Sequence, residues 1–199
     1  MMKFYGAPMS SAGRSRWMIE ETGAPYEYIV LNVREGGSKT PEFLAKNPSG
    51  KIPFLEDGDF RLAESVAINF YLAEKYAPPM WSTTTAGRAK IFEWSLWAVT
   101  NLQPEALTVM RHTVMLPEAQ RNPALIEPAK KECARLVAQL EQALVAENIL
   151  GDPLTVADVN VGSAVNLVLR IGAAEAAPKV TAWMERLRAR PAYQRATQG

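Results

Sequence analysis

A proline at the start of an apolar run is the strongest constraint on how this chain of 199 residues can fold. The run reads Asn-Pro-Ser-Gly-Lys-Ile-Pro-Phe-Leu over residues 47–55, and Pro53 opens its strand-like end. Because proline has no N–H, a strand tolerates it only at an edge, at its first residue or at a bulge. The backbone N–H and C=O of Ile52 are therefore expected to lie unpaired on a sheet edge, where an extended peptide can bind as an added strand.

A second segment follows after an Asp57-Gly58 pair, which is a strong hairpin signal. It predicts a short strand over 60–62 and then a helix that begins near Ser65, because apolar residues recur at helical spacing (Val66, Phe70, Leu72, Ala73). A helix start carries free N–H groups and the positive end of the dipole, so it can bind a carboxylate, and Glu64 beside it can meet an ammonium group. The alternative is that Glu64 and Ser65 only cap the helix.

The two segments in this order resemble the glutathione-binding half of cytosolic glutathione S-transferases, with motifs similar to those of the serine-type phi and theta classes and of bacterial members. The resemblance implies a cis Ile52–Pro53 bond, with the tripeptide glutathione bound along Ile52. It also implies that Ser65 receives the γ-glutamyl carboxylate of glutathione and that Glu64 receives its ammonium group.

The resemblance continues into the second half of the chain, from residue 3 to about residue 195 in all. Residues 151–158, Gly-Asp-Pro-Leu-Thr-Val-Ala-Asp, are similar to the buried N-cap motif of the transferase helical domain, and residues 180–192 are similar to its closing helix. Thr155 is predicted to be the N-cap, with Asp158 three positions later as its capping-box partner. This motif is interpreted as structural.

Two domains are expected, joined by a linker rich in proline, serine and threonine over residues 79–87. Residues 1–78 predict a thioredoxin-like α/β domain, and residues 88–199 predict an all-helical bundle. In the first domain we expect strands over 3–5, 26–33, 54–56 and 60–62, and helices over 13–21, 40–46 and 66–76. In the second domain we expect two long helices, over 88–116 and 125–147.

Composition restricts the partners and the compartment. A formal net charge of +1 argues against nucleic acid as a partner. The single cysteine, Cys133, cannot form an intramolecular disulfide, which favours a reducing compartment, and no apolar stretch is long enough to span a membrane. A cytoplasmic protein that makes no use of a membrane is therefore expected.

The catalytic group is expected in the turn over residues 6–14. In the serine-type classes the catalytic serine lies in this turn four residues before an arginine, a relation that Ser10 has to Arg14; Ser11 is the rival. The only histidine, His112, is far along the chain, so neither serine has a base that would make it a nucleophile. A serine hydroxyl is instead expected to stabilise the glutathione thiolate by a hydrogen bond, unless both serines merely cap the following helix.

The remaining assignments concern the glycyl end of glutathione and the electrophile. Ser38, Lys39 and Lys51 are candidates for the glycyl carboxylate of glutathione, against the alternative of a solvated basic surface. Met9 with Trp97 and Asn101, near Trp94, is a candidate lining for an apolar electrophile pocket, against the alternative that the aromatics form core. His112 and Cys133 are interpreted as structural, and no metal site is expected.

These assignments lead to one expected activity. The resemblance implies a glutathione S-transferase with a role in detoxification, which conjugates glutathione to small apolar electrophiles; activity on organic hydroperoxides is a further option. A homodimer is expected, although Ser49 stands where some members insert an aromatic key into the partner subunit. The alternatives are a glutathione-dependent thiol-disulfide oxidoreductase, which normally needs a cysteine in the turn, and a non-enzymatic glutathione-binding scaffold on the same fold.

Overall fold

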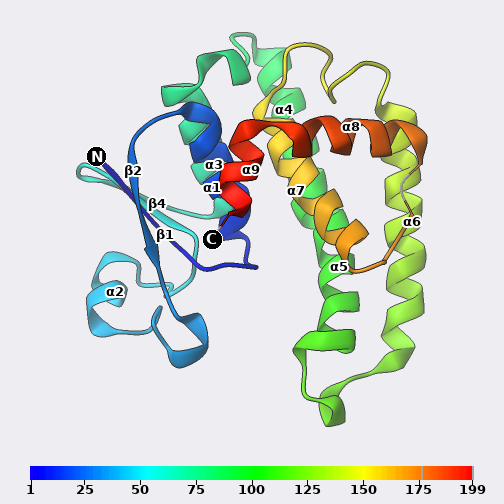
Figure 1. The fold of residues 1–199 in the computed structure, drawn as a ribbon, viewed down its shortest axis with the longest axis horizontal. Coiled ribbons are helices and arrows are strands. Elements are labelled where there is room, and N and C mark those ends of the chain that lie inside the picture. Colours follow the sequence, from blue (N-terminus) through cyan, green and yellow to red (C-terminus); the bar gives the residue numbers. More distant parts are fainter. Residues whose placement is uncertain (176, 199) are drawn as a thin grey trace. The chain divides into compact units, whose positions relative to one another are not determined.

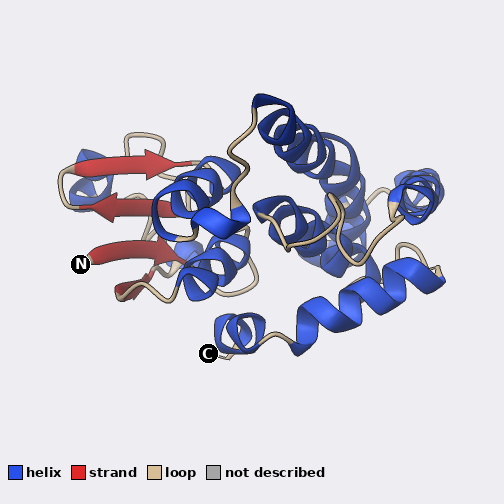
Figure 2. Ribbon diagram, turned by 90° about the horizontal axis from the view of Figure 1, so that it is seen from above, coloured by secondary structure: helices blue, strands red, loops and turns tan. Residues whose placement is uncertain are grey.

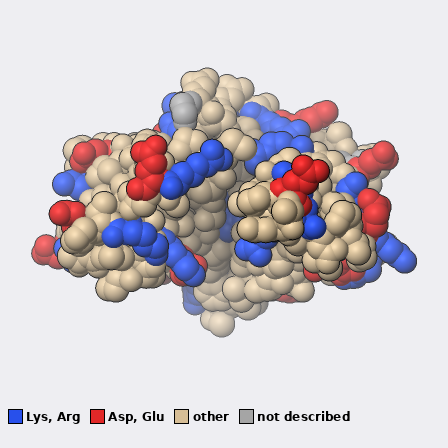
Figure 3. Space-filling view, turned by 90° about the horizontal axis from the view of Figure 1, so that it is seen from below, with Lys and Arg blue, Asp and Glu red and all other residues tan. Residues whose placement is uncertain are grey.

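The computed structural model describes residues 1–175 and 177–198. The chain divides into two compact units (Figure 1). One contains Met1–Trp81 together with the chain from Ala189 onward, and the other contains Ser82–Arg188. Basic and acidic side chains are interspersed on the face drawn in Figure 3, in keeping with the formal net charge of +1.

A four-stranded mixed sheet forms the centre of the first unit. Its strands are β1 (Met2–Gly6), β2 (Tyr26–Val30), β3 (Phe54–Asp57) and β4 (Phe60–Ala63), in the order β2-β1-β3-β4. The β1/β2 pair is parallel, and the other two pairs are antiparallel. All four predicted strands are confirmed. The strand predicted over 26–33 ends earlier, because a 3₁₀ turn begins at Val33.

Helices cover both faces of the sheet in this unit (Figure 2). α1 (Ala12–Thr22) and α3 (Ser65–Tyr76) pack together on one face, and α2 (Pro41–Lys46) lies on the other. Because side chains alternate along a strand, neighbouring residues of β1 serve different faces. Tyr5 packs against Phe43 of α2, while the adjacent Phe4 is fully buried. The arrangement confirms the thioredoxin-like fold.

The first turn of the chain brings α1 close to the end of β1. A Cβ on Gly6 would lie 2.7 Å from the Cβ of Ala12, closer than two carbons pack. Glycine therefore permits the short connection that places residues 10 and 11 at the end of the sheet.

The last helix, α9 (Pro191–Thr197), differs from the expectation that residues 88–199 form one helical domain. It packs on α1 in the first unit, where Tyr193 meets the edge of the Trp17 ring at 5.0 Å. The guanidinium of Arg190 binds both carboxylate oxygens of Glu21, each at 2.7 Å. These contacts hold the chain end on the α/β unit.

The second unit is helical, as predicted. Its helices are α4 (Thr85–Trp97), α5 (Gln103–Met110), α6 (Ile126–Ala143), α7 (Val156–Arg170) and α8 (Pro178–Ala189). The predicted helix 88–116 is present but contains two π-helical turns, at Ala98–Leu102 and Arg111–Met115. The helix predicted over 125–147 is shorter, since α6 ends at Ala143.

The predicted capping motif at the start of α7 is confirmed. Asp158 is fully buried and accepts hydrogen bonds from the backbone N–H and hydroxyl of Thr155, at 2.9 and 3.0 Å. It also accepts from the N–H of Ile149 at 2.9 Å and from the indole of Trp183 at 3.2 Å. Burial raises the pKa of Asp158, against the effect of these donors. The carboxylate joins three segments of the unit, as a structural group does.

Candidate functional site

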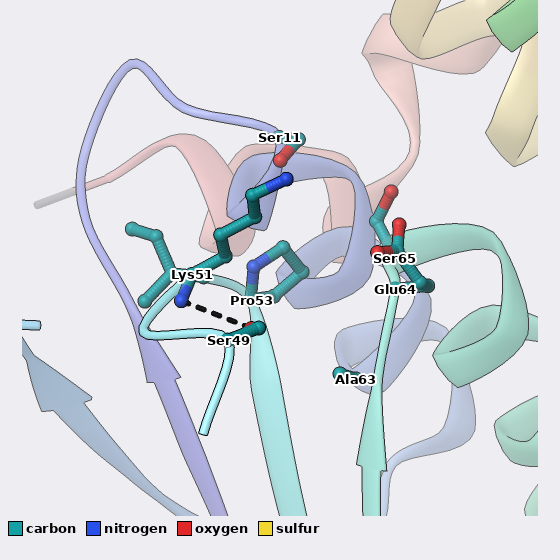
Figure 4. A pocket seen from close by; sticks show the side chains of 8 residues that line it. Ser11, Ser49, Lys51, Pro53, Ala63, Glu64 and Ser65 are labelled. Carbon is teal, nitrogen blue, oxygen red and sulfur yellow. Dashed lines mark hydrogen bonds between the residues drawn. The ribbon is translucent and has the colours of Figure 1, made fainter. Parts of the chain in front are cut away.

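A surface pocket of about 170 Å³ lies in the first unit, where three segments of the chain meet (Figure 4). The start of α1 contributes one wall, the loop before β3 another, and the junction of β4 with α3 the third. The residues that line the pocket are Ser11, Ser49, Lys51, Ile52, Pro53, Ala63, Glu64 and Ser65. Six of these were singled out from the sequence; Ser49 and Ala63 were not predicted as site residues.

Ile52 and Pro53 have the geometry that the resemblance implies, because their peptide bond is cis. The strand ladder ends at Phe54, which lies opposite Tyr5 on one side and Ala63 on the other. The backbone of Ile52 therefore lies beyond the last pair, at the end of the sheet beside the pocket. Its side chain is partly buried against Tyr5, Phe43 and Phe54.

The loop before Ile52 is held by its own polar groups. The amide of Asn47 donates to the carbonyl of Lys51 at 2.8 Å, and the hydroxyl of Ser49 donates to Asn47 Oδ1 at 2.9 Å. The N–H of Lys51 in turn donates to Ser49 Oγ at 3.2 Å. With its backbone fixed on both sides, Lys51 extends its side chain along the pocket in the direction of Ser11 (Figure 4).

Lys39, which precedes α2, binds the same loop through its side chain. Its ammonium donates to the carbonyl of Ser49 at 3.2 Å, and a Cβ on Gly50 would lie 2.5 Å from it. Gly50 also has a φ of +58°, so glycine serves both the turn and the close approach. Ser38 is buried and does not line the pocket, so the structure brings Lys51 to the pocket more directly than Ser38.

The junction of β4 with α3 carries unusual backbone geometry. Glu64 has a φ of +70°, in the left-handed region that costs a residue with a side chain about 1–3 kcal/mol. It is exposed on the pocket wall, and Ser65 follows as the first residue of α3. Strain of this kind persists where the surroundings fix the backbone, which is common at binding sites.

A buried arginine supports the start of α3. Arg14, only 4% exposed, donates through Nη1 to the hydroxyl oxygen of Ser65 at 3.1 Å. The hydroxyl of Ser15 donates to the carbonyl of Ser65, also at 3.1 Å. Burial lowers the pKa of Arg14 to about 10, so the guanidinium is still charged at neutral pH. A positive charge thus adds to the dipole of α3 at the place where Ser65 faces the pocket.

The two serines of the first turn have different surroundings. Ser10 Oγ donates to the carbonyl of Ala7 at 2.7 Å and accepts from the N–H of Ala12 at 3.1 Å, so its hydroxyl closes the turn. Ser11 lines the pocket, and its side chain makes no capping hydrogen bond to α1. The geometry favours Ser11, the rival in the sequence, as the hydroxyl that faces a ligand.

The remaining candidates lie outside the pocket. Met9 is 82% exposed with a φ of +56°. Trp97, in the helical unit, is partly buried with its ring 5.3 Å from that of Trp94. Asn101 is exposed, and its amide donates to the carbonyl of Trp97 at 3.3 Å.

The single histidine and the single cysteine of the chain also lie outside the pocket. His112 Nδ1 accepts a hydrogen bond from the N–H of Asn122 at 3.1 Å, and Cys133 is buried. In the described part of the chain, no three His, Cys, Asp or Glu side chains gather into a group that could hold a metal ion. None of its helices is both long and apolar enough to cross a membrane.

The chain is similar to known proteins over most of its length. Residues 1–74 match the family model for the glutathione S-transferase N-terminal domain, and residues 102–191 match the model for the C-terminal domain. Glutathione S-transferase 3 of Zea mays is 34% identical over 98% of this chain and 92% of its own. Glutathione S-transferase GstB of Escherichia coli K12 is 31% identical over 89% of this chain and 88% of its own.

Solved structures give the same result. The theta class glutathione S-transferase of Xanthomonas axonopodis pv. citri, crystallised with glutathione bound, has a TM-score of 0.89 at 33% identity and covers 100% of this chain and 97% of its own. A glutathione transferase family member from Pseudomonas fluorescens, with two glutathione molecules bound, has a TM-score of 0.86 at 26% identity, over 98% and 92% of the two chains. The chain described here belongs to the glutathione S-transferase family.

Proposed function

We propose that this protein binds glutathione in the pocket at the end of the sheet and transfers its thiolate to small apolar electrophiles. The single observation that supports this most is the composition of one pocket: a sheet end beside Ile52, a helix start at Ser65, an acid at Glu64 and a hydroxyl at Ser11. Each of these groups suits a different part of the same tripeptide. The named relatives and the glutathione-bound structures support the same activity.

The polar groups of the pocket match the charges of glutathione. The N-terminus of α3 and the hydroxyl of Ser65 suit the γ-glutamyl carboxylate, with Arg14 adding charge from behind. Glu64 suits the ammonium group, and the backbone of Ile52 suits the cysteinyl residue as an added strand. Lys51, which lines the pocket, and Lys39, which binds the same loop, suit the glycyl carboxylate. Ser38 is buried and does not line the pocket, so the structure supports it less than the two lysines.

Thiolate stabilisation is the chemical task of Ser11 in this proposal. Lowering the pKa of a thiol by two units requires about 3 kcal/mol, at roughly 1.4 kcal/mol a unit. A hydrogen bond to a charged group supplies about 1.5–3 kcal/mol, and a helix N-terminus adds about 0.3–2 kcal/mol. Ser11 at the start of α1 offers both. The thiol of bound glutathione then releases its proton to solvent at neutral pH without a base from the protein. The resulting thiolate of glutathione is the nucleophile that forms the new bond to the electrophilic carbon, which releases its leaving group or, in an addition, takes up a proton from solvent.

Other parts of the proposal follow from family membership. Met9 of the first unit stays a proposed contact for the electrophile, as do Trp97 and Asn101 of the helical unit, each taken by itself. Organic hydroperoxides are proposed as additional substrates. A homodimer in a reducing, cytoplasmic location is proposed as well. Sedimentation analysis tests the dimer, and a single species of monomer mass at micromolar concentration rejects it.

The test compares two serine variants in a conjugation assay with a panel of model electrophiles. Ser11→Ala is expected to lower kcat/KM at neutral pH by about ten- to a hundredfold, the loss of about 1.5–3 kcal/mol from one charged hydrogen bond. Ser10→Ala, the matched control in the same turn, is expected to keep conjugation within a few-fold. It is expected to lose about 1 kcal/mol of stability with the hydrogen bonds of the Ser10 hydroxyl to Ala7 and Ala12. A larger loss of kcat/KM in Ser10→Ala than in Ser11→Ala would instead assign the hydrogen bond to the thiolate to Ser10.

The same measurements separate the alternative functions. Binding of glutathione without turnover of any electrophile or hydroperoxide would favour a scaffold. Reduction of mixed disulfides that is faster than conjugation would favour an oxidoreductase, although the turn over residues 6–14 contains no cysteine. Failure of the wild-type protein to bind glutathione would reject the proposed site itself.

A further inference from the structure

Three polar side chains meet on the face of the sheet that carries α2. The hydroxyl of Tyr5, in β1, donates to Glu56 Oε2, in β3, at 2.5 Å. The ammonium of Lys46, the last residue of α2, donates to the same Glu56 oxygen at 2.9 Å and to the Tyr5 hydroxyl at 3.0 Å. We call these three residues the α2 anchor. None of them lines the pocket.

The anchor is buried in the sheet at one end and partly exposed at the other. Tyr5 and Glu56 are 6% and 8% exposed, whereas the side chain of Lys46 is 35% exposed. Burial raises the pKa of Glu56, but the hydrogen bonds from Tyr5 and Lys46 outweigh it and hold the pKa below its usual value. The carboxylate is therefore charged at neutral pH and attracts the lysine.

α2 depends on such anchors because it has only six residues. Isolated helices shorter than about 12 residues are marginal in water, so packing must hold this one. Besides the Thr40 cap, which accepts the N–H of Phe43 at 3.3 Å, two contacts hold it to the sheet. Phe43 packs against the rings of Tyr5 and Phe54 at 5.6 and 5.9 Å, and Lys46 closes the C-terminal end.

Both ends of α2 lead into the loops that carry the proposed carboxylate ligands. Ser38 and Lys39 precede the helix, and the Asn47–Lys51 loop follows Lys46 directly. The Lys39 ammonium also joins the two loops, through its hydrogen bond to the Ser49 carbonyl. Any movement of the C-terminal end of α2 therefore moves Lys51 and Lys39 relative to Ile52 and Pro53, which are tied to β3.

We propose that Lys46 is a positioning residue for the glycyl end of glutathione: by binding Tyr5 and Glu56, it fixes the loops that carry Lys39 and Lys51. This inference rests on the proposed function and assigns the affinity for one part of the ligand to a side chain that does not touch it. The proposed contacts of the γ-glutamyl end, Glu64 and Ser65, belong to the junction of β4 with α3 and not to a loop next to α2, so Lys46 is expected to have no such effect there.

The test compares two thiol ligands by calorimetry and steady-state kinetics. Glutathione has a glycyl residue, and γ-glutamylcysteine lacks it. Lys46→Met is expected to weaken glutathione binding by about tenfold, equivalent to about 1.4 kcal/mol, with a matching rise in KM and unchanged kcat. Binding of γ-glutamylcysteine is expected to change less than twofold. Lys46→Arg, which keeps the charge and the donors, is expected to restore most of the glutathione affinity.

Two further variants keep the inference falsifiable. Lys75→Met breaks a comparable lysine–carboxylate pair with Asp57 elsewhere in the unit, and is expected to leave the ratio of the two affinities unchanged. Glu56→Gln removes the carboxylate charge but keeps an acceptor for Tyr5, and is expected to reproduce the selective loss if Lys46→Met does not fold. Equal losses for both ligands, or no loss for glutathione, would overturn the inference. Absent glutathione binding in the wild type would instead reject the proposed function.

Discussion

Asp57, at the end of β3, accepts three hydrogen bonds on a single carboxylate oxygen. Tyr71 and Tyr76 donate from α3 at 2.6 Å each, and Lys75 donates at 2.7 Å. Burial raises the pKa of Asp57, but these three donors outweigh it and lower the pKa from 3.8 to about 2. The charged carboxylate therefore holds the C-terminal half of α3 to the β3–β4 hairpin, and leaves its N-terminal end at Ser65 facing the pocket.

The free energy of unfolding is expected to fall at acidic pH as the Asp57 carboxylate becomes protonated. Because the folded-state pKa is depressed, the contribution of Asp57 is complete above about pH 4 and is lost as the pH falls towards 2. Asp57→Asn is expected to lose about 1 kcal/mol at neutral pH, allowing for the screening of an exposed lysine. Urea unfolding at a series of pH values checks this: the stability difference between wild type and variant should shrink between pH 4 and pH 2. A constant difference would contradict the assignment.

The two serines show where residue-level reasoning from sequence ends. The sequence restricts the hydroxyl to Ser10 or Ser11, because the turn contains no cysteine and a histidine base is far away. The resemblance to the serine-type classes favours Ser10, which stands four residues before Arg14, but hydroxyl direction depends on the turn itself, in which Ser10 bonds to Ala7 and Ala12. The same limit explains Ser38, whose burial no local pattern indicates.

At the scale of elements, α1 is held from both sides. α3 packs along it, and α9 returns from the end of the chain to cover it. Glu21 of α1 has a side chain only 4% exposed, and it accepts from Arg190 at both oxygens and from the Trp17 indole at 2.9 Å. Since α1 begins at the turn that is proposed to face the thiol of glutathione, its fixed position supports the geometry of Ser11.

Removal of the Glu21 carboxylate tests how much the packing of α9 on α1 contributes to the stability of the protein. Glu21→Ala leaves the guanidinium of Arg190 and the indole of Trp17 without this acceptor, so we expect a loss of about 2 kcal/mol in the free energy of unfolding. Glu127→Ala removes one half of the exposed pair with Lys130 and is expected to change stability by less than about 0.5 kcal/mol. Equal denaturation midpoints for the two variants would show that α9 does not stabilise α1.

Periodicity predicted most elements, because it reports which side chains are buried. In the region of the helix predicted over 125–147, the apolar residues that recur at helical spacing are all buried (Cys133, Leu136, Val137, Leu140 and Leu144), and all four predicted strands are present. Periodicity does not report the partner against which a helix is buried. Residues 191–197 are an example: they form a helix, but that helix packs on α1, near the other end of the chain. No local sequence pattern indicates a contact between residues so far apart in the chain.

On the scale of the whole molecule, sheet order assembles the proposed glutathione site from distant segments. Ser11, Ile52 and Glu64 are far apart in sequence but meet because β1, β3 and β4 are neighbours. Family membership could be inferred from the sequence since these segments keep a fixed order along the chain. The residues that contact the electrophile could not be inferred, because side-chain direction, which no local pattern indicates, decides which groups meet a substrate.

The most direct test of the account is titration of the thiol of bound glutathione, followed by the ultraviolet absorbance of the thiolate. At saturating glutathione, we expect the wild-type complex to titrate about two pH units below the free thiol, equivalent to about 3 kcal/mol. In Ser11→Ala, which is expected still to bind glutathione, the pKa of the bound thiol is expected to lie at least one unit higher than in the wild-type complex. A bound thiol that titrates like the free one, or a shift that Ser11→Ala leaves intact, would contradict thiolate stabilisation by the start of α1.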